Sequence, residues 1–231
     1  MQIPILSILA LLPLAVAILL LFLPAAKRNL IRGIALGTSI ITLILSVIVF
    51  FGYNTTLGGY QYVVKADWLP ALGISFHLGV DGIGAAMELM AGLVVFSGVM
   101  VSWHIEDRPR EFFSFLLFLA SSVFGVFASL DLFQLFIFFE LAIFPKYLMI
   151  VMWGSPKTKE YGGMKLTLYL FLGSMVALVG VLAMYFGSGL RTFDMVALEN
   201  AGFGVEFQRL WFPFVFLGFG VLGGIFPFHS W

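Results

Sequence analysis

Long apolar stretches, separated by short polar connections, leave this chain few folds to adopt. A bilayer core about 30 Å thick requires roughly 20 consecutive apolar residues in a spanning helix. Seven segments meet this requirement: 3–24, 33–53, 82–103, 112–129, 132–153, 164–187 and 210–230. Only 10% of the residues are charged, against about 25% in soluble domains. The sequence therefore predicts an all-α, polytopic transmembrane helix bundle in a lipid bilayer.

The basic residues are distributed unevenly between the connections of the predicted spans. Eight lie in or beside the connections after the first, third and fifth spans: Lys27, Arg28, Arg32, Arg108, Arg110, Lys157, Lys159 and Lys165. Three lie in the opposite connections: Lys65, Arg191 and Arg209. Because Lys and Arg accumulate in cytoplasmic loops, this bias predicts that the N-terminus faces outside. The formal net charge is zero and no basic block occurs, so a nucleic acid partner is not expected.

Two of the outer connections are predicted to have structure of their own. Residues 54–80 alternate apolar and polar side chains around Leu69–Pro70–Ala71, which is typical of a β-hairpin. The segment 192–202 predicts a short amphipathic helix, with Thr192 as the N-cap and Gly202 as the stop. We interpret both connections as packing lids rather than catalytic elements.

Several potential cofactor signals lack the context that they require. The chain has no cysteine, and its three histidines are too scattered to indicate a metal or haem site. Residues 218–223, GFGVLG, match the spacing of a dinucleotide fingerprint, but no soluble βαβ unit surrounds them. We interpret these glycines as sites of close helix approach, with Gly220 and Gly224 in small-xxx-small spacing. No bound cofactor and no metal are expected.

Glu140 and Lys146 lie inside the fifth predicted span, in FFELAIFPKYLMI. A charge at the centre of a spanning helix costs about 2.5–3.5 kcal/mol on insertion scales, so such residues usually face a protein interior or a hydrated cavity. Six residues of helix separate the two by about 9 Å of rise and roughly 120° of rotation, and Pro145 between them disturbs the hydrogen-bond ladder. Two interpretations stay open: a buried structural ion pair, and a proton relay whose proton affinities respond to neighbouring charges.

Other ionisable residues lie along the predicted spans. Glu88 is about seven residues into the third span, where an interfacial position and a relay role are equally open. His229 follows a helix-breaking proline, and broken helices are tolerated where they line a cavity. Lys165 is expected to extend to the cytoplasmic face. Asp81 and Asp131 are predicted to cap helix starts.

Four stretches, in this order and spacing, resemble the antiporter-like membrane subunits of respiratory complex I, most closely the M-type subunit. They are FHLGVDGI, SLDLFQLFIFFELAIFPKYLMI, MKLTLYLFLGS and IFPFHSW. The resemblance runs from about Phe76 onward and implies a full chain of about fourteen spans, of which this is roughly the N-terminal half. It also implies a division into N-terminal helices with an outer hairpin loop, residues 1–110, and the first half of a proton-translocating unit, residues 111–231.

The resemblance assigns roles to individual residues. In that family the glutamate that matches Glu140 is an essential carboxylate of the proton path and works with a lysine on a broken seventh helix. That lysine precedes the histidine of the PFH sequence by seven residues, and Leu222 occupies the position here. We hypothesise that Lys146 supplies the missing positive charge. The predicted proton path comprises Glu140, Lys146, His229 and Glu88.

The implied function is proton translocation by a non-redox subunit of an NADH:quinone oxidoreductase in the bacterial cytoplasmic membrane. Its expected partners are other membrane subunits of complex I, especially neighbouring antiporter-like subunits. Two alternatives remain: a subunit of a multi-subunit cation/proton antiporter or membrane-bound hydrogenase, and a structural scaffold whose buried charges only fix helix packing. Co-purification with flavin and iron–sulfur subunits distinguishes an oxidoreductase from a pure antiporter, and only a scaffold tolerates Glu140→Gln.

Overall fold

The computed structural model describes residues 4–231, and the chain divides into two compact units. The first unit comprises the residues up to 64 together with 78–129, and the second comprises 65–77 and 130–231. These units are defined by packing. The predicted division at residue 110 concerns proton translocation and stays a prediction.

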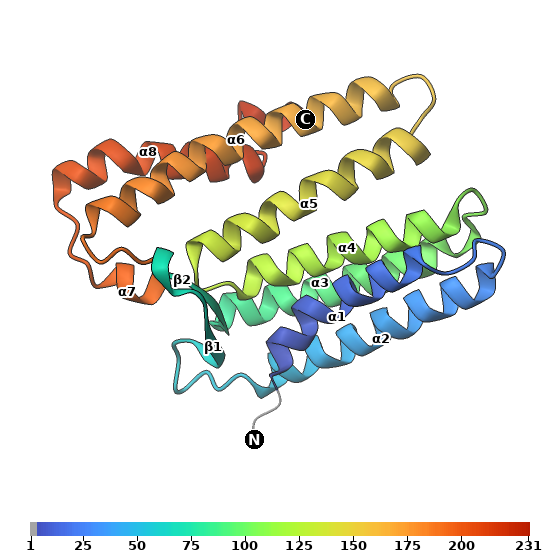
Figure 1. Cartoon of the computed structure of the whole chain (residues 1–231), viewed down its shortest axis with the longest axis horizontal. Helices are drawn as coiled ribbons and strands as arrows, with labels where there is room; N and C mark the ends of the chain where they lie inside the picture. The colour runs from blue at the N-terminus through green and yellow to red at the C-terminus, as the bar shows by residue number, and fades with distance from the viewer. Residues whose placement is uncertain (1–3) are drawn as a thin grey trace. The chain divides into compact units, whose positions relative to one another are not determined.

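The first unit is built from four helices, each joined to the next in antiparallel order (Figure 1). They are α1 (Ile5–Leu21), α2 (Arg28–Gly52), α3 (Gly82–Val101) and α4 (Pro109–Ala128). Helix α1 packs on α2 and α4, and α3 packs on the same two helices. A single 3-10 turn, Ser102–His104, follows α3.

Buried serine hydroxyls join α4 to α1. The Ser114 hydroxyl donates to the Ala17 carbonyl at 2.7 Å, and the Ser121 hydroxyl donates to the Ala10 carbonyl at 2.6 Å. Small residues of this kind let helix backbones approach closely, and hydrogen bonds between helices replace the hydrophobic effect as the attraction inside lipid. The two bonds therefore hold α1 in the bundle.

The second unit contains three long helices and one short helix. They are α5 (Leu132–Trp153), α6 (Lys159–Gly187), α7 (Met195–Glu199) and α8 (Val205–Leu222). Helix α6 packs against both α5 and α8. Pro145 lies inside α5 without ending it.

The helical fold is confirmed. In the part of the chain that the structure describes, six helices are long and apolar enough to cross a membrane: α2, α3 with its 3-10 turn, α4, α5, α6 and α8. The prediction had seven spans, and the difference lies at α1. This helix is apolar but has only 17 residues, which is the lower end of the range of about 17–25 residues for a spanning helix.

The last predicted span, 210–230, is wrong at both ends. Helix α8 begins at Val205 and ends at Leu222, and a 3-10 turn, Phe228–Ser230, follows. Gly223 and Gly224 stand directly after the helix, and Gly224 adopts φ +68°, a conformation that a residue with a Cβ seldom adopts. The chain therefore leaves the helix several residues before Pro227.

The two structured connections are confirmed, with corrections at both ends of the short helix, which ends at Glu199 rather than at Gly202. Strands β1 (Gln61–Leu69) and β2 (Ile74–Val80) pair around a 3-10 turn, Pro70–Leu72, as the predicted hairpin. The short helix is also present, as α7. Its N-cap is Asp194 rather than Thr192, because the Asp194 carboxylate accepts from the backbone N–H groups of Val196 and Ala197. The Thr192 hydroxyl instead accepts from the N–H of Asp194.

Glycines bring α6 and α8 close together. A Cβ added at Gly218 of α8 would lie 2.6 Å from the Cα of Ala177 on α6. Gly173 and Gly180 of α6 are approached by valine side chains of α8 in the same way. The predicted close approach of a neighbouring helix at Gly220 and Gly224 is wrong, since both glycines lie against the chain that follows α8, at Ile225 and Trp231. We call the contact through Gly173, Gly180 and Gly218 the glycine seam.

Gly218→Ala is expected to lower the free energy of unfolding by about 1–3 kcal/mol, because the added methyl meets backbone atoms that cannot rotate away. Gly220→Ala is the matched control on the same helix. Its methyl would meet only the Ile225 side chain at 3.5 Å, so its effect should be small. Thermal unfolding of both variants in the same detergent checks the difference, and equal midpoints would contradict the close approach at Gly218.

Candidate functional site

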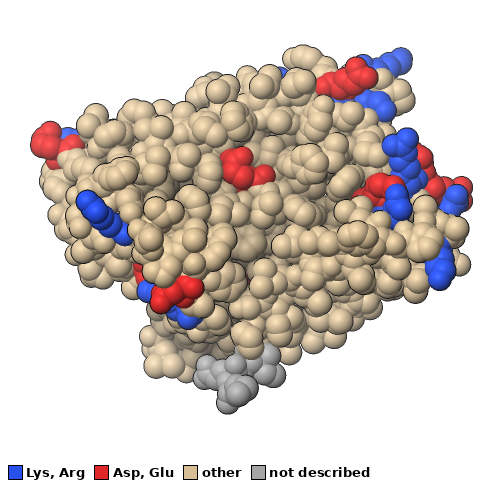
Figure 2. All heavy atoms as spheres, in the orientation of Figure 1, with Lys and Arg blue, Asp and Glu red and all other residues tan. Residues whose placement is uncertain are grey.

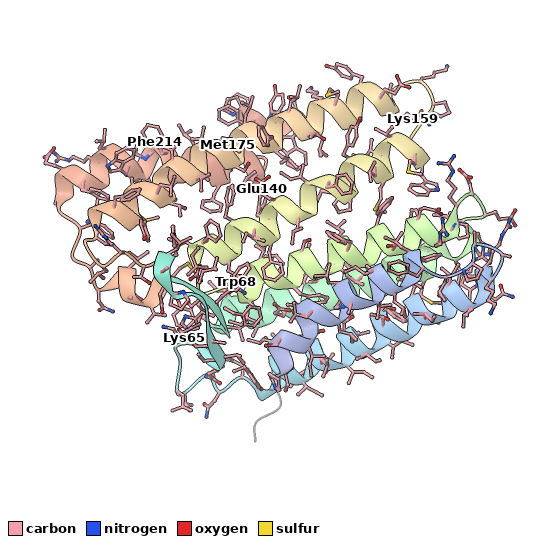
Figure 3. The ribbon with its side chains drawn as sticks, viewed as in Figure 1. Lys65, Trp68, Glu140, Lys159, Met175 and Phe214 are labelled. Carbon is pink, nitrogen blue, oxygen red and sulfur yellow. The ribbon has the colours of Figure 1, made fainter. Side chains whose placement is uncertain are left out.

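Glu140 lies near the middle of α5 and is half-buried. Among the described residues, its buried Oε1 atom has no hydrogen-bond partner. Figure 3 labels Glu140, and at the same place in the view Figure 2 shows acidic side-chain atoms surrounded by uncharged residues. A carboxylate oxygen without a donor in such surroundings is costly. Glu140 is therefore free to exchange a proton without first breaking a hydrogen bond at Oε1.

Lys146 is half-buried on the same helix. In the part of the chain that the structure describes, no ion pair joins it to Glu140 or to any other carboxylate. The structural ion pair between Glu140 and Lys146 is therefore not formed. The proton-relay interpretation stays open for both residues.

Glu88 lies in the first unit and is fully buried, with 0% of its surface exposed. This position excludes the interfacial alternative for its side chain. Neither carboxylate oxygen has a hydrogen-bond partner within residues 4–231. Gly84 and Gly92, one turn to either side on α3, lie close to Phe127 of α4 and Ser46 of α2. Glu88 thus occupies a tightly packed helix face.

His229 lies in the 3-10 turn beyond α8 and is exposed. Its ring stacks on Phe226, with 5.7 Å between the ring centroids. The backbone around it is irregular, as predicted. It belongs to the second unit together with Glu140 and Lys146, whereas Glu88 belongs to the first.

Leu222 occupies the position at which the sequence resemblance implies a lysine. Its side chain packs against an apolar cluster formed by Ile143 of α5 and by Leu166 and Leu170 of α6. An apolar side chain in apolar surroundings therefore occupies this position in place of a charge.

The sequence interpretation missed a polar cluster at the start of α5. We call it the hairpin cluster; it consists of Lys65, His77, Asp131, Gln134 and Asp194. The Lys65 ammonium lies 2.5 Å from Asp194 Oδ2, and His77 Nδ1 lies 3.3 Å from the same oxygen. These residues come from β1, β2 and the N-terminal ends of α5 and α7, so no local pattern in the sequence connects them.

Burial and charge set the protonation states of the hairpin cluster. Burial lowers the pKa of His77 below its ordinary value and outweighs the opposite effect of the Asp194 carboxylate. Burial raises the pKa of Asp194, but the hydrogen bonds from Lys65 and from the N–H of Ala197 outweigh it, so the pKa lies below its ordinary value. At neutral pH the imidazole is neutral and the carboxylate is ionised.

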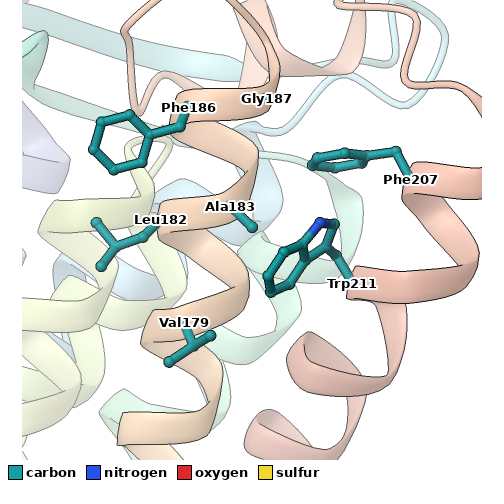
Figure 4. A pocket seen from close by; sticks show the side chains of 7 residues that line it. All are labelled: Val179, Leu182, Ala183, Phe186, Gly187, Phe207 and Trp211. Atoms are coloured by element: carbon teal, nitrogen blue, oxygen red, sulfur yellow. The ribbon is translucent and has the colours of Figure 1, made fainter.

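Two further features bear on possible ligands. Within residues 4–231, no group of three or more His, Cys, Asp or Glu side chains is arranged to hold a metal ion. An open apolar groove of about 510 Å³ lies between α6 and α8. Phe207 and Trp211 of α8 face α6 there, at Ala183 and Gly187 (Figure 4). The groove offers almost no polar group for proton transfer.

Comparison with known proteins shows which family the second half of the chain matches. The family model described as NADH:quinone oxidoreductase/Mrp antiporter, transmembrane, matches residues 129–231. A protein of Trichodesmium erythraeum named NAD(P)H-quinone oxidoreductase chain 4 2 is 38% identical to this chain. The match covers 100% of this chain and 41% of the relative. The corresponding chain of Microcystis aeruginosa is 35% identical over 99% of this chain and 41% of the relative. The chain thus spans less than half the length of these curated relatives.

Solved structures agree with the sequence comparison. A chain of respiratory complex I from Thermus thermophilus with bound NADH superimposes with a TM-score of 0.85 at 28% identity, over 98% of this chain and 45% of that chain. A chain of the Mrp complex from Dietzia superimposes with a TM-score of 0.82 at 20% identity, over 99% and 42% respectively, and shows the shared fold alone. Residues 129–231 therefore match the family that NADH:quinone oxidoreductases and Mrp antiporters share, and the whole chain is similar to chain 4 of NAD(P)H-quinone oxidoreductases.

Proposed function

We propose that the chain is part of a proton-translocating membrane subunit of an NADH:quinone oxidoreductase. It carries no redox centre or other cofactor, lies in the bacterial cytoplasmic membrane with its N-terminus outside, and works beside neighbouring antiporter-like subunits of the complex. The observation that carries the proposal is Glu140, whose Oε1 is buried without a donor in the described chain. It lies midway along an apolar helix, in the segment that matches the family model.

Electrostatic coupling gives such a carboxylate a way to respond to chemistry elsewhere. A unit charge that moves to about 10 Å from it changes its proton affinity by about 1.7 kcal/mol at an effective dielectric constant of about 20. Since about 1.36 kcal/mol corresponds to a factor of ten, this changes the ratio of protonated to ionised carboxyl about 17-fold. Redox chemistry in other subunits can thus drive uptake and release of a proton through a chain of charge movements.

Lys146 is proposed to supply the fixed positive charge in place of the lysine that is absent at Leu222. It lies about 9 Å along α5 from Glu140 and has no carboxylate partner in the described chain. His229 and Glu88 are proposed as further members of the path.

Lys146→Met is expected to slow NADH-driven proton transport at least tenfold, because the variant keeps the side-chain length but removes the charge. Proton uptake into inverted membrane vesicles, measured with a fluorescent pH indicator, checks this expectation. Lys157→Met, in the exposed connection after α5, is the control and should transport protons normally. A Lys146→Met complex that transports protons at the wild-type rate would remove the lysine from the mechanism.

Purification of the complete protein from its native membranes tests the function as a whole. An affinity tag on the full-length chain should bring down flavin- and iron–sulfur-containing subunits, and the complex should couple NADH oxidation to proton transport. A complex that contains membrane subunits alone and exchanges cations for protons without NADH would assign the chain to a cation/proton antiporter instead.

A further inference from the structure

The hairpin cluster fixes His77 to the first turn of α5. The N–H of His77 donates to Gln134 Oε1 at 2.8 Å, and the His77 carbonyl accepts from the N–H of Leu130 at 2.8 Å. On the same strand, the N–H of Ser75 donates to Asp131 Oδ2 at 2.9 Å. The imidazole is thus held next to the helix that carries Glu140.

Two buried nitrogens in this cluster have no hydrogen-bond partner in the described chain. They are His77 Nδ1 and Gln134 Nε2. Nδ1 nevertheless lies 3.3 Å from Asp194 Oδ2, so protonation of the ring would create an ion pair there. Polar side-chain atoms buried without a partner need an explanation, and a proton that binds and leaves at His77 provides one.

The cluster also connects the buried imidazole to the surface. The His77 and Asp194 side chains are each only 7% exposed, whereas Lys65 is 51% exposed and shares the Asp194 oxygen with the imidazole. Histidine is the side chain whose ordinary pKa lies closest to neutrality. The charged groups that face the imidazole are Lys65, Asp131 and Asp194.

We propose that His77 is a proton-relay residue that transfers protons between the aqueous phase at the hairpin end of α5 and the interior carboxylate Glu140. The proposal rests on the proposed function and assigns its outer access point. The Asp194 carboxylate stabilises the protonated imidazole of His77. The Lys65 ammonium keeps Asp194 ionised and weakens the attraction of Asp194 for the proton on His77. Gln134, which contacts His77, precedes Glu140 on α5 by about 9 Å of helix rise. A short chain of water molecules can span this distance.

The test uses the full-length protein in its assembled complex. His77→Gly should slow proton transport about 100-fold, the order of magnitude lost with a general acid–base group. Added imidazole should restore transport, because it can occupy the space and carry the proton. With 4-methylimidazole, which is more basic, the pH dependence of the restored transport should move to higher pH. Loss of a merely structural side chain would give no such shift.

Each outcome separates this proposal from the proposed function. Glu140→Gln is measured in parallel: if it blocks transport while His77→Gly transports protons normally, the relay proposal fails and the proposed function stands. If both variants transport normally, the proposed function fails. A His77→Gly complex that assembles but is not restored by either imidazole also overturns the relay.

Asp194→Asn covers the case in which His77→Gly does not assemble. Asparagine can still cap α7, but it removes the negative charge that faces Nδ1. The pKa that limits transport at low pH should then be lower in the Asp194→Asn complex than in the wild-type complex, because the protonated imidazole of His77 loses its counter-ion. An unchanged pH profile would overturn the proposal.

Discussion

Replacement of Glu140 by glutamine is expected to abolish NADH-driven proton transport, with a fall of about 100-fold or more, while the protein still folds and assembles. Glutamine has nearly the same shape but cannot hold and release a proton. The replacement breaks no hydrogen bond at Oε1, because that atom has no partner within the described chain. A loss of transport would therefore report on proton transfer rather than on packing.

Two companion variants make the Glu140 result specific. Glu140→Asp keeps the carboxylate and should retain part of the transport. Glu206→Gln, at an exposed glutamate of α8 that pairs with Arg209 at 3.1 Å, should leave transport unchanged. Proton uptake and thermal unfolding are measured on the same preparations. Normal transport by the Glu140→Gln complex would identify the chain as a structural scaffold.

Asp131→Ala is expected to cause the largest loss of stability, about 3–5 kcal/mol, because it leaves several buried donors without an acceptor. The Asp131 side chain is fully buried. One oxygen accepts from the N–H groups of Phe133 and Gln134 at 3.0 and 3.1 Å. The other accepts from the N–H and the hydroxyl of Ser75 at 2.9 and 3.2 Å. A single carboxylate thus caps α5 and attaches the hairpin to it.

Asp81→Ala provides the matched control at the start of α3. The half-buried Asp81 accepts one hydrogen bond, from the N–H of Gly84 at 2.6 Å, so its loss should cost about 1 kcal/mol. Thermal unfolding in detergent should place the Asp131→Ala midpoint well below that of Asp81→Ala. Similar midpoints for the two variants would contradict the anchoring role of Asp131.

The helices were predictable from sequence because lipid demands long apolar segments, and such segments are visible without any knowledge of packing. Their ends were less predictable. The apolar run at the end of the chain continues to Phe228, whereas the helix ends at Leu222. At α7, both Thr192 and Asp194 have the chemistry of an N-cap, and the local backbone decides between them.

The same contrast holds for the candidate site. Glu140 and Lys146 stand out in the sequence because charges are expensive inside an apolar helix. The hairpin cluster does not stand out, because its ionisable members lie in polar connections where charges are common and Gln134, in the first turn of α5, is uncharged. Lys65 and Asp194 are 129 positions apart, and His77 and Gln134 are 57 positions apart. Only the tertiary fold brings them together, so no spacing rule could have found them.

The glycine seam has a mechanical consequence for the end of the chain. Because α6 and α8 touch through backbone and short side chains at Gly173, Gly180 and Gly218, α8 has little room to slide or tilt against α6. The segment that carries His229 is in turn attached to α8, because the Trp231 indole N–H donates to the Val221 carbonyl and the Ile225 N–H donates to the Gly220 carbonyl, both at 2.9 Å. We therefore expect a displacement of this segment to be transmitted to α8 and, through the seam, to α6.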